Sequence, residues 1–159
     1  MRLIYLIAAL LFLSACATVP AGAPSYSRAA DASPGHENVY IYRLGAYPTL
    51  RTPAVAIDGL KVFDPPEKGY TVVSLTKGTH ELTVKWSWDT GWPNLTFPFN
   101  VTATAPLYIK ISGSFETVGV GRFRAGSLLQ VIPQALAESE LMSCCRYIAP
   151  HGEIWEASN

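Results

Sequence analysis

Charged residues are scarce in this chain, because Asp, Glu, Lys and Arg make up only 15% of its 159 residues. A typical globular chain has about a quarter. Twelve basic side chains are balanced by twelve acidic ones. Nucleic-acid binding requires a strongly basic face, which this balance does not supply. The composition therefore argues against a nucleic-acid partner and predicts a surface that is polar but uncharged, or partly apolar.

The chain also lacks an apolar run long enough for a permanent transmembrane helix. The run at residues 3–13 would extend about 16 Å as a helix, whereas a bilayer's hydrocarbon core is roughly 30 Å thick. Arg2 precedes this run, and the small residues Ser14 and Ala15 follow it. That layout is typical of a secretory signal peptide. We therefore expect residues 1–15 to be removed from the mature protein.

Sequence motifs for catalysis and metal binding are missing as well. No HExxH or CxxC pattern accompanies the widely spaced His36, His80 and His151, so no metal site is predicted. No GxSxG elbow occurs, and no Ser, His and Asp group by motif. We therefore predict that the protein is not an enzyme. A hydrolase acting on envelope glycans through two carboxylates is the less favoured alternative, since their separation depends on the fold.

What the chain does have is a lipidation signal. Leu13-Ser14-Ala15-Cys16 resembles the lipobox of bacterial lipoproteins. The resemblance implies a diacylglycerol on the Cys16 thiol, cleavage before Cys16 and a further N-acyl group, with no other cofactor. Two or three acyl chains anchor a protein durably, whereas one does not. Because Ala17 rather than an aspartate follows, the resemblance implies the outer membrane, facing the periplasm. An ordinary secreted protein cut near Ala17 is the alternative.

The mature chain would have 144 residues, with eleven basic and twelve acidic side chains. Residues 16–37 hold the lipidated Cys16 followed by a stretch rich in Ala, Pro, Ser and Gly, which predicts a flexible tether. Residues 38–159, about 120 in number, have the size of one domain with one core.

Short strands separated by Gly, Pro and Asp dominate that domain. The strand at 38–44 has apolar side chains on both faces, so we expect it inside a sheet. Asp58-Gly59 predicts a type I′ hairpin turn. Helix formers follow Pro133 and predict one short helix, to about Cys145. The expected strands are 38–44, 54–57, 60–63, 70–75, 81–86, 97–103, 107–111 and a buried 128–132.

These elements predict a mainly β fold: an antiparallel β-sandwich of seven or eight short strands with one short C-terminal helix, or else an open barrel. Residues 55–62, Gly69-Tyr70 and residues 77–84 resemble small bacterial lipoproteins with domain of unknown function 2846, and the related PEGA-type sandwich repeats. The resemblance spans residues 39–112 and consists of turn motifs. Lys77 stands where proline is usual in those families. The resemblance implies no activity.

Two groups of residues are candidate contacts for a ligand or partner. Trp88 and Trp92 lie near Trp86, and their flat faces suit the sugar rings of peptidoglycan or lipopolysaccharide, or a membrane interface. Alternatively, they cover the edge of a core that contains Trp86. Arg122 and Arg124 fall on one face of an extended segment and suit lipid or glycan phosphates, or form the solvated edge of a hairpin.

Cys144 and Cys145 are the thiols that remain after lipidation of Cys16. Neighbouring Cα atoms lie 3.80 Å apart, below the usual 4.4 Å minimum for a disulfide, so a bridge between them should be easily reduced. A redox-responsive module is therefore one hypothesis, and two buried thiols are its alternative. The main prediction is a membrane-anchored envelope lipoprotein with a non-catalytic binding or structural role. Its expected partners are the bilayer and, through the domain, peptidoglycan, lipopolysaccharide or an envelope protein.

Overall fold

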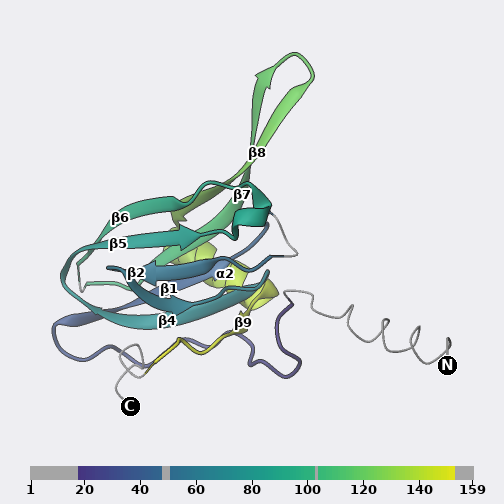
Figure 1. The fold of residues 1–159 in the computed structure, drawn as a ribbon. Helices are drawn as coiled ribbons and strands as arrows, with labels where there is room; N and C mark the ends of the chain where they lie inside the picture. The colour runs from purple at the N-terminus through teal and green to yellow at the C-terminus, as the bar shows by residue number, and fades with distance from the viewer. Residues whose placement is uncertain (1–17, 48–50, 103, 153–159) are drawn as a thin grey trace, which may run out of the picture.

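The computed structural model describes residues 18–47, 51–102 and 104–152. The predicted signal peptide, the lipobox and Cys16 lie outside them. In the described part, two sheets pack face to face, as Figure 1 shows, and the predicted sandwich is confirmed. The strands are β1 (His36–Arg43), β2 (Ala54–Ile57), β3 (Leu60–Phe63), β4 (Gly69–Thr76), β5 (Gly78–Lys85), β6 (Leu95–Val101), β7 (Leu107–Gly119), β8 (Arg122–Val131) and β9 (Arg146–Tyr147).

Among the described residues, one sheet has five strands in the order β8-β7-β1-β4-β9, and the other has four in the order β3-β2-β5-β6. Most pairings are antiparallel, as predicted, but β1 pairs with β7 and β4 pairs with β9 in parallel. The sequence did not predict the two-residue strand β9, which is too short to show a pattern. All strand pairings and both hydrophobic clusters of the described chain lie within residues 18–152.

Strand β1 lies in the middle of its sheet and is buried on both faces, as its sequence predicts. Val39 and Ile41 point into the core between the sheets, while Tyr40 and Tyr42 point to the outer face. The hairpin between β2 and β3 is also confirmed. Asp58 and Gly59 have φ angles of 50° and 80°, the positive values that a type I′ turn requires.

The outer face of the five-stranded sheet carries a second core, which we call the tyrosine cluster. It is made by Tyr26, Tyr40, Tyr42, Tyr70, Tyr108 and Tyr147. The helix α2 (Gln134–Cys144) covers it with Ala137 and Leu141, close to the predicted bounds. Aromatic rings bury large areas, so this cluster holds the helix onto the sheet. No helix among the described residues has the length and apolarity needed to span a membrane.

The segment at 24–30 differs from the flexible tether that its composition predicts. The Tyr26 ring packs edge-on against Tyr70, with 5.5 Å between ring centroids. The backbone N–H of Ala29 donates to the Tyr40 hydroxyl at 2.9 Å, and Ser25 forms a β-bridge with Arg146. Tyr26 alone, among small residues, is enough to dock the segment on the sheet. A prediction from average composition misses the effect of one such residue.

Strands β7 and β8 are much longer than the predicted 107–111 and 128–132. They pair from Ile109↔Val131 out to Gly119↔Arg122 and project as a two-stranded arm beyond the sandwich (Figure 1). Alternation in the arm is hidden by serine, threonine and glycine, so periodicity gives little signal there. The expectation that 128–132 is buried is only partly met, because Leu128 and Val131 are 42% and 48% exposed while Leu129 is buried. Strand β8 is an edge strand, so part of it faces solvent.

Candidate functional site

The arm is fixed to the sandwich at its base. The backbone N–H of Gly113 donates to the carbonyl of Gly45 at 2.9 Å, just after β1 ends. The ring of Tyr47 meets Phe115 edge-on at 5.5 Å. The hydroxyl of Ser127 donates to the carbonyl of Tyr47. These contacts place the arm at the end of the sandwich where β1 finishes, which we call the arm end.

The tip of the arm is apolar. Val118 is 46% exposed and Val120 is fully exposed, with Gly119 and Gly121 beside them. Gly121 has a φ of 69°, a conformation that a turn needs and that side chains disfavour. The pairing register shifts between Thr117 and Gly119, so Val118 lies at a β-bulge. The tip therefore presents valines to solvent on a backbone that bends away from the sheet.

Both candidate arginines lie in the arm. Arg122 is exposed and pairs with Gly119, directly at the tip. The backbone of Arg124 pairs with Glu116, and its side chain lies outside the described part of the structure. The hairpin that was one interpretation of this segment is therefore present, and Arg122 lies at its exposed end.

The tryptophan loop lies at the same end. The short helix η2 (Trp88–Thr90) follows β5 and exposes 94% of Trp88. Asp89 forms an ion pair with Arg51 at 2.7 Å and ties η2 to the loop that leads into β2. Trp92 is half-buried against Trp86, with 6.1 Å between ring centroids. Of the two candidate tryptophans, Trp88 alone is freely presented, while Trp92 covers the core edge.

The tryptophan loop and the arm are neighbours in space. Gly91, Trp92, Pro93 and Ala125 line one shallow hollow between them. Figure 1 shows η2 beside the base of the arm. The structure thus brings the two candidate groups, which are separated by some thirty residues in sequence, to one end of the molecule.

A buried arginine organises this end. Arg43 is the last residue of β1 and is fully buried. Its guanidinium donates to the backbone carbonyls of Arg51, Pro65 and Ala46 at 2.8–3.1 Å. It also lies 5.1 Å from the ring centroid of Trp86 and 3.5 Å from a Glu67 oxygen. Burial lowers the pKa of this guanidinium, which the nearby Glu67 carboxylate opposes. No sequence signal marks this residue, because its partners are carbonyls brought together only by the fold.

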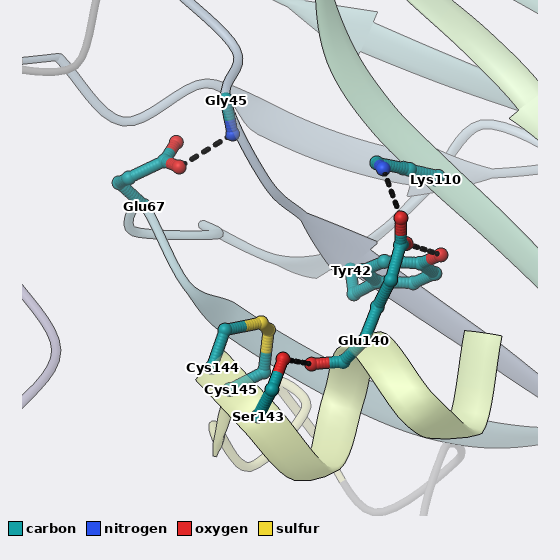
Figure 2. The surroundings of a disulfide bond; sticks show 8 residues. All are labelled: Tyr42, Gly45, Glu67, Lys110, Glu140, Ser143, Cys144 and Cys145. Atoms are coloured by element: carbon teal, nitrogen blue, oxygen red, sulfur yellow. Dashed lines mark hydrogen bonds and ion pairs between the residues drawn. A yellow bond between two sulfur atoms is a disulfide. The ribbon is translucent and has the colours of Figure 1, made fainter. Parts of the chain in front are cut away.

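The two C-terminal cysteines form a disulfide at the end of α2, beside Ser143 (Figure 2). Cys145 is buried in the tyrosine cluster and Cys144 packs against it. Further along the same helix, Glu140 accepts hydrogen bonds from Tyr42 at 2.6 Å and from Lys110 at 2.7 Å. Burial opposes the charge of Glu140, but these two bonds lower its pKa. Helix α2 is therefore held by a polar contact as well as by the aromatic core.

The opposite end of the sandwich carries an Asp–His pair. One carboxylate oxygen of Asp58 lies 2.7 Å from Nδ1 of His80, and the carbonyl of Thr76 lies 2.9 Å from Nε2. The other Asp58 oxygen accepts from the backbone N–H of Glu81. Burial opposes the charge of His80, but the two acceptors raise its pKa overall. The pair links two turns, and no hydroxyl or thiol nucleophile is among its hydrogen-bonding partners.

Within the described residues, no group of three or more His, Cys, Asp or Glu side chains is placed to hold a metal ion. No family model matches the sequence, and neither a curated protein nor a solved structure matches the chain. The resemblance to lipoproteins with domain of unknown function 2846 therefore stays a prediction.

Proposed function

We propose that this chain is a lipid-anchored, non-catalytic binding module of a bacterial envelope. In this proposal Cys16 carries the lipid, the outer membrane holds it and the domain faces the periplasm. The proposal rests on the four lipobox-like residues Leu13-Ser14-Ala15-Cys16, which follow a run too short to span a bilayer.

The docked N-terminal segment supports this proposal. Thr18 and Pro20 lie against the sandwich, where they line a shallow hollow with Asp64, Pro66 and Ile148. Two residues span at most about 7 Å, so an anchor at Cys16 would hold the domain directly against the bilayer surface. The module would thus act at the membrane itself rather than on a long tether.

A binding role, in preference to a catalytic one, is supported by the arm end. It gathers exposed aromatic and apolar side chains, as interaction surfaces do. Exposed large apolar residues at this end are Tyr47, Trp88, Phe115, Val118 and Val120.

Metabolic labelling with a clickable palmitate analogue tests the anchor. We expect the wild-type protein to take up label and to fractionate with membranes, and the Cys16→Ser variant to do neither. The double variant Cys144→Ser/Cys145→Ser is the matched thiol control and should label as wild type does. A wild-type protein without label, or a Cys16→Ser variant that keeps it, would contradict the proposal.

A redox-responsive module is the second candidate, favoured by the disulfide between Cys144 and Cys145. A dithiol reductant of the envelope would supply two electrons and two protons, yielding two free thiols and its own disulfide. Because Cys145 is buried among tyrosines, the change would act on the packing of α2. Thiol counting by mass spectrometry after mild reduction of the native protein tests this. Reduction under native conditions, with altered protease sensitivity of α2, is expected. A disulfide that opens only in denaturant would reject this role.

A further inference from the structure

We infer that the arm end is a second, non-covalent membrane contact, whose valine tip enters the headgroup region of the same phospholipid bilayer that holds the anchor. This inference rests on the proposed anchor at Cys16 and names the ligand of the arm end. The occupant is a bilayer with anionic headgroups.

The described chain begins at the same end of the sandwich from which the arm leaves. Thr18 lines its hollow with Pro66, which precedes β4 at the end of the sandwich where β1 finishes. The arm leaves the sandwich at that same end, since its pairing continues past Ile111↔Arg43, the last pair of β7 with β1. In Figure 1 the arm rises from the top of the sandwich, and the described chain begins at the lower right. A bilayer within about 7 Å of Thr18 would therefore lie at the end of the sandwich from which the arm leaves.

The exposed side chains of the arm end are of types that suit a membrane surface. Val118 presents nearly half of its area to solvent and Val120 presents all of it. Trp88, 94% exposed, stands near the arm base, and tryptophan favours the membrane–water interface. Of the ten large apolar residues that the described structure exposes, five lie at the arm end. The other five are spread over the turn between β2 and β3 (Leu60), β8 (Leu128 and Val131) and α2 (Leu136 and Met142). The largest group of exposed apolar side chains thus lies where the bilayer would be.

The charges of the arm fit anionic headgroups. Between residues 112 and 127 the sequence has one acidic side chain, Glu116, and two basic ones, Arg122 and Arg124. Arg122 is exposed and pairs with Gly119 beside the valine tip. A guanidinium beside an inserted apolar tip can donate to lipid phosphates while the valines lose contact with water.

The experiment replaces the lipid anchor with a histidine tag, so that its result does not depend on lipidation of Cys16. A chain of residues 17–159, which contains every strand and hydrophobic cluster that the structure describes, receives an N-terminal histidine tag. It is bound to vesicles of phosphatidylethanolamine and phosphatidylglycerol that contain a nickel-chelating lipid. An environment-sensitive dye is attached at Val120→Cys, without reductant, so that the Cys144–Cys145 disulfide does not react. The matched control is Leu60→Cys, which is 53% exposed at the start of β3, beside the hairpin turn of the opposite end.

We expect a blue-shifted dye at position 120 that is quenched by brominated acyl chains, and an unshifted, unquenched dye at position 60. Adding Val118→Asp should reduce the inserted fraction by about tenfold or more, because burying one valine is worth roughly that factor. A dye at 120 that keeps its solution spectrum on vesicles would overturn the inference. So would a shift that appears without vesicles and grows with protein concentration, which would assign the tip to a second copy of the chain. Failure of lipidation at Cys16 would leave all these readouts unchanged.

Discussion

Replacing Gly113 with alanine should loosen the arm base, and the structure gives the size of the effect. A Cβ atom at this position would lie 2.5 Å from the carbonyl oxygen of Gly45 and 3.2 Å from a ring carbon of Tyr47. The first neighbour is backbone and cannot rotate away. It is also the acceptor for the Gly113 N–H, so moving it weakens that hydrogen bond.

We expect Gly113→Ala to cost about 2 kcal/mol, combining overpacking with a weakened hydrogen bond. For a domain of this size, that cost lowers Tm by roughly 5–10 °C. Thermal and urea unfolding followed by circular dichroism measure both quantities. Gly126→Ala is the matched control on the facing strand, since its Cβ would meet only the Ser114 hydroxyl, at 2.7 Å. That hydroxyl can rotate, so the control should lie within about 1 kcal/mol of wild type. Equal stability losses in the two variants, or a neutral Gly113→Ala, would show that close packing of Gly113 against Gly45 does not stabilise the arm base.

Three further predictions concern the docked segment and the titrating pairs. Tyr26→Ala should release the N-terminal segment and speed tryptic cleavage after Arg28 by about tenfold or more, because the half-buried Tyr26 ring holds the segment on the sheet. An unchanged cleavage rate would show that Tyr26 does not dock the segment. Glu140 has a lowered pKa, so its contribution to stability is present above about pH 4.5 and is lost as pH falls through the folded value. In the Glu140→Gln variant, the urea concentration at the unfolding midpoint should therefore change less between about pH 3 and 5 than it does in the wild-type protein. His80 has a raised pKa, so its contribution to stability is present below about pH 6.5 and is lost as pH rises through the folded value. Asp58→Asn keeps the turn but removes the carboxylate, so the slope of stability against pH should become shallower, because only the Thr76 carbonyl still raises the pKa. An unchanged slope would contradict the pairing.

The sequence predicted the sandwich well because most of its strands carry strong local signals. Alternation marks Leu82, Val84 and Trp86 as a buried face, and all three are buried. The turn at Asp58-Gly59 needs no tertiary information, since both residues suit positive φ angles.

Features that depend on distant partners were missed. Nothing local shows that Tyr26 docks on Tyr70, since the contact joins residues far apart in the chain. Nor does a pattern mark the buried Arg43, whose partners are three carbonyls in two loops. The sequence indicated Trp88 and Arg122 as candidate contacts separately, each from its residue type and its near neighbours in the chain. That they share one end of the molecule, while Trp92 covers the core, follows only from the fold.

The chemical state of Cys16 is the central claim, and mass spectrometry of the protein purified from membranes tests it most directly. After denaturation, trypsin should release residues 16–28 as the N-terminal peptide, because Arg28 is the first basic residue after Cys16. We expect this peptide to begin at Cys16 and to carry a diacylglyceryl thioether together with an N-acyl group. An unmodified peptide beginning at Ala17, or one that still contains residues 3–15, would contradict it.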